Sequence, residues 1–407
     1  MAILANGHPV RPVLSTGWMP RNYCRDPGRN IVLCPGVGLD VNASFSASSA
    51  SFPAIIIGAG QAGLAAAWHL SRRGVQFTVL DANPGPGGAW QHRWDALTLG
   101  AAHHIHPLPG FALEHQDASR PASAVVSEYY AEYERRFDLP VRHGIEIRSA
   151  QRDGTGFVLA DASGGQWRAD ALINATGTWT SPFIPYYPGL QDFAGPQVHT
   201  NGYRGVEQFA GQRVLVVGGG ASATQFLIAL DAAGVDTLWS TRRAPDWRDA
   251  SNNPEWGLEV EQRVNQRILA GGPAGSVVSN TGLMLTAAMQ AGIDSGLLAS
   301  RGKIERFGQH QVHFADGSTE QVDAVLWATG FRHAHQHLAP LHLHNAAGGL
   351  NLASDTVSSL DAPGLFFVGY GASASTLGAT RAGRKAATAA ARYLAQLPAG
   401  QSQTSTK

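Results

Sequence analysis

Two short stretches of small residues carry the clearest chemistry in this sequence, because their spacing suits the pyrophosphate of a dinucleotide. The first stretch follows the apolar run 54–57 and has the pattern G-x-G-x-x-G; the second follows the run 213–217 and has G-x-G-x-x-A. In such a turn the first glycine makes the bend, the second lets a phosphate approach the backbone, and the third small residue lets the next helix pack closely. We therefore predict two nucleotide-binding turns, with contacts from Gly58, Gly60 and Gly63 in the first and from Gly218, Gly220 and Ser222 in the second.

The residues after the next strand of each unit indicate which nucleotide binds there. Asp81 ends the first unit, close to where a carboxylate meets a ribose hydroxyl. The second unit ends instead in Ser240, Thr241, Arg242 and Arg243. Arginine forks bind phosphate oxygens, and an acid here would repel a 2′-phosphate. We predict FAD at the first turn and NADPH at the second, with Ser240, Arg242 and Arg243 as contacts; two arginines on a solvated surface are the alternative interpretation.

Three further stretches supply candidate flavin contacts. Gly88 and Trp90 lie in the loop NPGPGGAW, where the glycines allow a close backbone approach. Trp90 could stack beside a planar ligand or fill a buried loop position. Thr176 lies where the strand ALIN runs into a turn, and Gly369 ends the short strand GLFFVG. We include all four among the predicted cofactor-binding residues.

A histidine cluster follows the first of these loops. His103, His104 and His106 occupy three of four consecutive positions. Such a cluster can bind a metal ion, but carboxylates and thiolates are sparse nearby. We therefore predict a pocket-lining or surface loop and no metal site, with His103 and His104 as candidate pocket residues.

Composition excludes several functional classes. The chain has 407 residues with 30 basic and 30 acidic side chains. It therefore lacks the excess of positive charge that would indicate binding to nucleic acid or to an anionic membrane. No apolar run is long enough to span a membrane and no secretory signal is visible, so we expect a cytoplasmic protein. The two cysteines, Cys24 and Cys34, lie ahead of the first strand and have neither dithiol nor zinc spacing.

The order of these features predicts an α/β fold with two Rossmann-like dinucleotide-binding domains, the second inserted in the first. We predict a flexible segment at 1–51, the FAD domain at 52–203 and 321–394, the NADPH domain at 204–320, and a disordered tail at 395–407. Within this frame we expect helices at 64–74, 123–137, 255–269 and 281–298. We also expect a hairpin at 303–322 that turns at Asp316-Gly317.

With these motifs in place, the chain resembles the class B flavin-containing monooxygenases, near the plant auxin-forming subgroup and its bacterial relatives. The stretch 193–203 fits the family pattern F-x-G-x-x-x-H-x-x-x-[FY] at Phe193, Gly195, His199 and Tyr203. Three further stretches of this chain resemble other signatures of the family: WATGF at 327–331, GGAW at 87–90 and STR at 240–242. The residues Ala101 to His104 stand where animal members have an active-site asparagine.

The resemblance implies an FAD- and NADPH-dependent monooxygenase that uses O₂, through a flavin C4a-(hydro)peroxide, to oxygenate a small molecule. Soft nitrogen, sulfur or arsenic nucleophiles and 2-oxo acids all suit that chemistry. Among the motif residues, His199 and Tyr203 are candidates for a pocket or for the contact between domains. For His199 we favour a domain-linking hydrogen bond over proton transfer.

Two other functions stay open at this point. One is an NADPH-dependent reductase or oxidase without a redox-active disulfide, and the other is a flavin-binding protein without enzymatic activity. The sequence identifies no catalytic side chain and leaves the substrate open. It also leaves the oligomeric state open, with a homodimer as one option.

Overall fold

The computed structural model describes residues 23–25, 31–33, 49–102, 105–114, 116–248, 256–275 and 282–398. Residues 1–46 form a unit of their own, in which β1 (Tyr23–Arg25) and β2 (Ile31–Leu33) pair antiparallel. The predicted flexible segment and disordered tail fall largely outside the described residues. Within the described part of the chain, no helix combines the length and the apolar character needed to cross a membrane.

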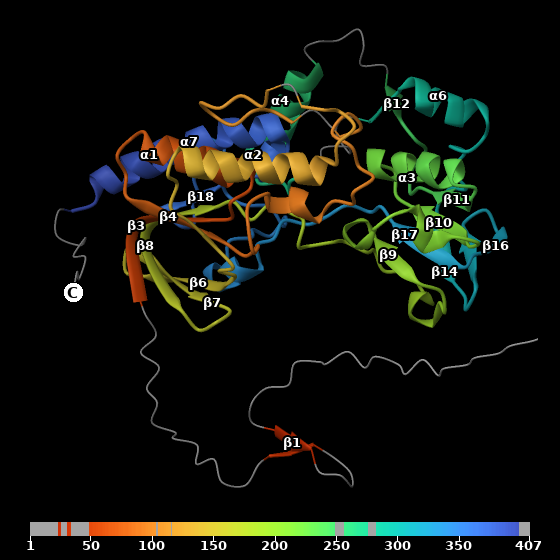
Figure 1. Cartoon of the computed structure of the whole chain (residues 1–407), viewed down its shortest axis with the longest axis horizontal. Helices are drawn as coiled ribbons and strands as arrows, with labels where there is room; N and C mark the ends of the chain where they lie inside the picture. The colour runs from red at the N-terminus through yellow and green to blue at the C-terminus, as the bar shows by residue number, and fades with distance from the viewer. Residues whose placement is uncertain are drawn as a thin grey trace, which may run out of the picture. The chain divides into compact units, whose positions relative to one another are not determined.

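The larger sheet of the second unit, residues 47–407, contains the first glycine turn. Its strand order is β5-β4-β3-β8-β7-β6, and β18 also pairs with β8 (Figure 1). The strands are β3 (Ser49–Ile57), β4 (Phe77–Asp81), β5 (Val141–His143), β6 (Ile147–Asp153), β7 (Gly156–Asp161), β8 (Gln166–Asn174) and β18 (Leu365–Phe367). β3, β4, β5, β8 and β18 run parallel to their neighbours, whereas β6, β7 and the start of β8 pair antiparallel.

A second, fully parallel sheet contains the second glycine turn, in the order β11-β10-β17-β9. Its strands are β9 (Gln197–His199), β10 (Arg213–Val217), β11 (Asp236–Ser240) and β17 (Ala324–Trp327). Two small sheets accompany it: the antiparallel β14 (Ile304–Phe307), β15 (Gln311–Phe314) and β16 (Thr319–Gln321), and the parallel pair β12 (Trp247–Arg248) and β13 (Leu283–Met284). The two glycine turns thus belong to different sheets.

Both glycine turns are built in the same way. In the larger sheet, β3 runs between β4 and β8, and β8 continues into Ala175-Thr176-Gly177. In the second sheet, β10 runs between β11 and β17, and β17 continues into Ala328-Thr329-Gly330. The amide of Ala175 donates to the last residue of β3 and the amide of Ala328 donates to the last residue of β10, each at 2.8 Å. The structure is therefore an α/β fold with an internal repeat of a strand, a glycine turn and a neighbouring ATG strand.

Helices α1 (Gln61–Ser71), α2 (Ala122–Arg136) and α7 (Thr376–Gln396) lie together above the larger sheet (Figure 1). Alternate residues of β3 face opposite sides, so that Ala54 and Ile56 pack under these helices while Ile55 and Ile57 enter a core on the other side. The helix of the second turn is α3 (Ala221–Ala232); α4 (Trp256–Leu269) and α6 (Ala287–Asp294) follow it.

The seam between α1 and α7 is made of small residues. α7 presents Gly383, and a β-carbon there would lie 2.8 Å from the Ala62 oxygen, the Ala65 β-carbon and the Ala66 nitrogen of α1. Contacts this short are repulsive, so the two backbones lie closer than any larger residue would allow. On α1 itself, a β-carbon at Gly63 would overlap the carbonyl of Gly58. The third glycine of the motif therefore packs the helix onto the turn, as its spacing predicts.

Some elements differ from those that the sequence predicts. The expected helix at 281–298 is instead the strand β13 followed by the shorter α6. The expected hairpin at 303–322 has three strands, and Asp316-Gly317 connects the last two. α1 ends at Ser71, three residues before Gly74, whose φ of 68° still ends the turn that follows. α2 begins at Ala122 and ends at Arg136, one residue earlier at each end than the expected helix at 123–137.

We predict that the seam between α1 and α7 tolerates no branched side chain. Gly383→Val should lower the free energy of unfolding by at least about 2 kcal/mol, because overpacking a closed contact displaces backbone. Ala395→Val, at an exposed position on the same helix, should change it by less than about 1 kcal/mol. Urea unfolding measures both variants. Equal stability of the two would show that the seam adapts to larger residues.

Candidate active site

The first glycine turn leaves open space in front of α1. Gly60 is the N-cap of this helix, and no atom lies within 4 Å of where its β-carbon would be. No side chain caps the helix and its first turn holds no acidic residue, so the backbone amides there face that space. Helix N-termini of this kind bind phosphate through backbone amides and the helix dipole. The turn therefore fits the pyrophosphate of FAD.

Asp81 holds the same turn from the end of β4. Its Oδ2 accepts from the Ala59 amide at 2.5 Å and its Oδ1 accepts from the Asn83 amide at 2.8 Å. The side chain is 4% exposed. A carboxylate has about four acceptor positions, so these two bonds leave acceptors for a ribose hydroxyl. Asp81 thus fixes the backbone of the turn in addition to its predicted contact.

The four other predicted flavin contacts come from three separate loops that meet beside the turn. Gly88 lies against Gly60, with 2.9 Å between its β-carbon position and the Gly60 α-carbon. Thr176 donates to the Ala334 carbonyl at 2.8 Å, and a β-carbon at Gly369 would lie 3.8 Å from the α-carbon of Gly177. Trp90, in the 3-10 helix Gly88–His92, packs against the core under α1 and α2. Residues distant in sequence are thus brought to one edge of the sheet.

The second glycine turn repeats these features at the N-terminus of α3. Gly220 is the N-cap, no side chain caps the helix, no acid lies in its first turn, and Ser222 is half-buried within that turn. The Trp239 indole donates to the Gly218 carbonyl at 2.7 Å. Ser240 is 2% exposed and its hydroxyl donates to the Gly302 carbonyl at 2.8 Å. In this geometry the Ser240 hydroxyl supports the turn, and its oxygen keeps acceptor capacity for a nucleotide.

Arg242 and Arg243 extend beyond the end of β11, next to this second turn. Val217 pairs with Ser240, so both arginines follow the strand edge at which Gly218 begins the bend. Both side chains are exposed, and within the described residues neither forms a hydrogen bond or an ion pair. Two unpaired guanidinium groups at this edge fit a 2′-phosphate.

His199 and Tyr203 lie near each other in the chain but in different surroundings. The His199 Nε2 lies 2.9 Å from the Gly330 carbonyl, which only accepts, so Nε2 carries the proton and Nδ1 accepts from the Asn201 amide. Burial lowers the pKa of His199, which keeps the ring neutral. Tyr203 is 3% exposed and packs on Trp94 and Phe226. His199 is therefore placed to link two loops, whereas Tyr203 fills the core of the second sheet.

His103 and His104 lie outside the described residues, so their predicted place in a pocket stays a prediction. The neighbouring His106 is described, and its carbonyl accepts from the Gln61 side chain at 2.9 Å. Across the described ranges, no group of three or more histidine, cysteine or acidic side chains is arranged to hold a metal ion.

A row of buried histidines follows the second ATG turn, and the sequence analysis did not identify it. Burial lowers the pKa of His333 and of His337 to about 4, and burial lowers the pKa of His335 to about 3. The His337 Nε2 lies 2.8 Å from the Asn174 side-chain oxygen at the end of β8. The His333 and His335 rings both pack on Tyr370. These neutral rings hold the segment after Gly330 against the loops of the first site.

Two more residues of the site were missed. Gln61 donates to the His106 carbonyl and to Thr380 at 3.0 Å, and it accepts from the buried Tyr130 hydroxyl at 2.6 Å. It thereby joins the start of α1 to α2 and α7. Arg93 lies over the ring of Trp179, at 4.1 Å from the guanidinium carbon to the ring centre. In the sequence, only the short spacing between Trp90 and Arg93 could have indicated a cation stacked on a ring. The contact between Arg93 and Trp179 joins residues distant in the chain, so no local sequence pattern predicts it.

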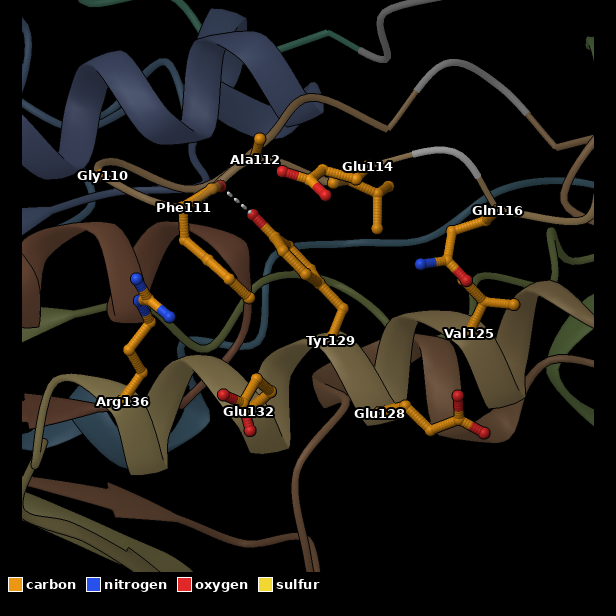
Figure 2. A pocket seen from close by; sticks show the side chains of 11 residues that line it. Gly110, Phe111, Ala112, Glu114, Gln116, Val125, Glu128, Tyr129, Glu132 and Arg136 are labelled. Atoms are coloured by element: carbon orange, nitrogen blue, oxygen red, sulfur yellow. Dashed lines mark hydrogen bonds between the residues drawn. The ribbon is translucent and has the colours of Figure 1, made fainter.

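A surface pocket of about 580 Å³ lies between α2 and the segment 110–116 (Figure 2). The Tyr129 hydroxyl reaches the Phe111 carbonyl at 2.6 Å across its floor. Its charged lining consists of Glu114, Glu128, Glu132 and Arg136. An excess of carboxylates repels phosphate, and neither glycine turn contributes to the lining, so the pocket is separate from the predicted nucleotide sites.

Comparison with known proteins agrees with this architecture. The family model described as pyridine nucleotide-disulphide oxidoreductase matches residues 55–369. The solved flavin-containing monooxygenase from Stenotrophomonas maltophilia is 32% identical, with a TM-score of 0.72 over 84% of this chain and 99% of that chain. The indole-3-pyruvate monooxygenase YUCCA1 from Oryza sativa subsp. japonica is 29% identical over 320 residues, covering 69% of this chain and 76% of the relative.

The chain belongs to the pyridine nucleotide-disulphide oxidoreductase family and, within it, to the flavin-containing monooxygenases. It is a flavin-dependent oxidoreductase, and enzymes of this class use FAD and NADPH. The expected family and the expected α/β architecture are thereby confirmed. A solved cyclohexanone monooxygenase, at 19% identity and a TM-score of 0.56 over 80% of this chain, shares the fold.

We predict that substitutions at Gly60 separate flavin binding from folding. Gly60→Val meets no protein atom and keeps an extended backbone that valine tolerates, but its side chain fills the space in front of α1. The variant should fold with unchanged helicity and lose at least about 90% of its bound FAD, since tenfold weaker binding costs only about 1.4 kcal/mol. The ratio of flavin to protein absorbance measures this, with Gly60→Ala as an intermediate. Full FAD occupancy in Gly60→Val would mean that the first turn is misassigned.

We also predict that the buried histidines make the protein sensitive to acid. Because the folded pKa values of His333, His335 and His337 lie below the ordinary value of about 6.5, the unfolded chain binds more protons in this range. Their contribution to the free energy of unfolding is complete above pH 6.5 and is lost as the pH falls toward about 4.

His335→Phe keeps a ring beside Phe367 and removes one titrating group. Between about pH 6 and pH 4 it should reduce the slope of unfolding free energy against pH by up to about 1.4 kcal/mol per pH unit. Urea unfolding at several pH values measures the slope, and His310→Phe at an exposed position is the control. A slope identical to that of the unaltered protein would show that His335 does not titrate on unfolding.

Proposed function

We propose that the protein is an FAD- and NADPH-dependent monooxygenase that inserts one atom of O₂ into a small-molecule substrate. The observation that carries this proposal is the pair of glycine turns in separate sheets, each with an uncapped helix N-terminus and an adjoining ATG strand. Two dinucleotides held at two such edges would let one nucleotide reduce the other. With a soft nucleophile, the balanced reaction converts substrate, NADPH, H⁺ and O₂ into oxygenated substrate, NADP⁺ and water. With a 2-oxo acid, the same reactants give the carboxylic acid that is one carbon shorter, CO₂, NADP⁺ and water.

The residues near the first turn would hold FAD, and those near the second would hold NADPH. We assign Gly58, Gly60, Gly63, Asp81, Gly88, Trp90, Thr176 and Gly369 to FAD, and Gly218, Gly220, Ser222, Ser240, Arg242 and Arg243 to NADPH. When bound, the flavin accepts hydride from NADPH and activates O₂, so the chain itself binds, orients and excludes water. In that scheme His199 positions the Gly330 loop and transfers no proton.

The proposed domain division follows from the same assignment. The NADPH domain, predicted at 204–320, is inserted between the FAD segments 52–203 and 321–394. Strands β9 and β17, at either side of that range, pair in the sheet of β10. Both strands therefore belong to the sheet of the second turn, and the connections between the domains would run just before Gln197–His199 and just after Ala324–Trp327.

A mechanism that uses a redox-active disulfide is disfavoured, although the family name refers to disulphide oxidoreductases. The sequence from residue 35 to residue 407 contains no cysteine, so no dithiol can lie on the larger unit beside the flavin. An electron acceptor other than a dithiol on this unit is required. O₂ with a soft nucleophile or a 2-oxo acid meets this requirement, and 2-oxo acids are favoured by the similarity to an indole-3-pyruvate monooxygenase.

The test measures the fate of labelled O₂. FAD-loaded protein is mixed with NADPH, ¹⁸O₂ and a panel of amines, thioethers and 2-oxo acids, and products are analysed by mass spectrometry. One labelled oxygen per product molecule is the expected result, with NADPH consumption accelerated by the same compound. NADPH consumption that yields only hydrogen peroxide across the whole panel would replace the proposal with the reductase or oxidase alternative.

We predict that Arg242 and Arg243 select NADPH over NADH. Loss of a charge-assisted contact costs about 1.5–3 kcal/mol, so Arg242→Ala combined with Arg243→Ala should raise the Kd for NADPH about tenfold or more. NADH lacks the 2′-phosphate and should be affected little. Rapid-mixing measurement of flavin reduction against nucleotide concentration gives both values, and Arg306→Ala, another exposed arginine, is the control. An unchanged preference in the double variant would refute the assignment.

A further inference from the structure

Arg93 is a cation without a partner beside the flavin-site loops. It directly follows the 3-10 helix Gly88–His92, and its guanidinium carbon lies 4.1 Å from the Trp179 ring centre and 5.7 Å from the Trp90 ring centre. Its Nε is buried and unbonded, and within the described residues its side chain makes no hydrogen bond and no ion pair. Burial lowers the pKa of Arg93 to about 10, so it stays charged at neutral pH.

Stacking on tryptophan does not by itself account for this arrangement. Seven described arginines lie over aromatic rings, and Arg93 is the one among them that is partly buried, whereas the other six are exposed. A ring face attracts the cation but accepts few hydrogen bonds from its N–H groups. The other six arginines are exposed, so water can accept hydrogen bonds from their N–H groups. A partly buried guanidinium whose buried Nε has no acceptor indicates that an acceptor joins the group on binding.

The position of Arg93 indicates which molecule brings that acceptor. Trp90 belongs to the loop that packs on Gly60, and Trp179 follows the first ATG turn. Trp179 stacks on Phe331 at 5.1 Å, and Phe331 follows the second ATG turn. Arg93 therefore lies where the loops of the two dinucleotide sites meet, which is where a substrate would approach both nucleotides.

The phosphates of both nucleotides already have binding groups elsewhere. The amides of α1 and α3 face the two pyrophosphate positions, and Arg242 and Arg243 lie at the edge suited to a 2′-phosphate. Neither nucleotide therefore requires the positive charge of Arg93, which is available to bind the substrate. A guanidinium stacked between rings presents its edge, and that edge forms two parallel bonds with a carboxylate.

We propose that Arg93 binds the carboxylate of the substrate, so that the enzyme acts on organic acids in preference to their neutral analogues. This inference rests on the proposed monooxygenase function, because the junction of the two nucleotide sites defines the place for the substrate. The guanidinium lies over the rings of Trp90 and Trp179, which would shield one side of the ion pair from water. One guanidinium carries a single positive charge, which suits a monoanion.

The test compares matched acids and amides in equilibrium binding. Calorimetry on FAD-loaded protein uses acetate with acetamide, phenylacetate with phenylacetamide, and indole-3-acetate with indole-3-acetamide. In the unaltered protein at least one acid should bind tenfold or more tightly than its amide. Arg93→Gln should abolish that preference, and Arg93→Lys, which keeps charge but loses the planar fork, should retain part of it. Arg72→Gln, at an exposed arginine over Trp68, should behave as the unaltered protein.

Two results would overturn the inference: an unaltered protein that binds no acid better than its amide, or an Arg93→Gln variant that keeps the preference. If Arg93→Gln does not fold, the difference in affinity between each acid and its amide, measured in the unaltered protein and in Arg93→Lys, still tests the inference. NADPH-driven flavin reduction without substrate separates this inference from the proposed function. Its absence in the unaltered protein would refute the function, whereas normal reduction without acid preference would refute only the role of Arg93.

Discussion

The closeness of a glycine α-carbon to a neighbouring strand's carbonyl is the constraint on which both halves of this protein depend. A β-carbon at Gly58 would lie 2.6 Å from the Ala175 oxygen, and one at Gly218 would overlap the Ala328 oxygen. Each glycine turn is therefore closed by the ATG strand beside it. This packing sets the direction of the helix that follows each turn. It also places Thr176-Gly177 and Thr329-Gly330 at the same sheet edge as the turn beside them.

Much of this could be predicted from the sequence, because the turns depend on local spacing. Glycine positions, the apolar runs before them and the residues after the next strand all lie within one unit of chain. The opposed charges of Asp81 and Arg242 could also be predicted, since a strand edge fixes where they emerge. The two-domain α/β architecture and the flavin-dependent family follow from these features and are confirmed.

The rest depends on contacts between distant residues and could not be predicted. Arg93 and Trp179 are adjacent in space only because two loops leave the same edge of one sheet. The histidines at 333–337 alternate as a strand would, yet they become neutral because Tyr370 and Asn174 enclose them. The stretch 281–298 has a helical pattern, but β13 forms because β12 offers it a partner. Ser240 has the right type and position for a ligand, but the sequence does not indicate that its hydroxyl also donates to the Gly302 carbonyl.

The repeated turn has a consequence for how such a protein can change. Both sites use the same backbone device, and that device is buried and intolerant of side chains. The residues that distinguish the sites, Asp81 at one and the exposed Arg242 and Arg243 at the other, lie at the end of β4 and past the end of β11. Under the proposed assignment, nucleotide selectivity at the second site would be carried by surface positions that support no core. Such a chain can evolve a different electron donor in a few steps while its scaffold stays constant.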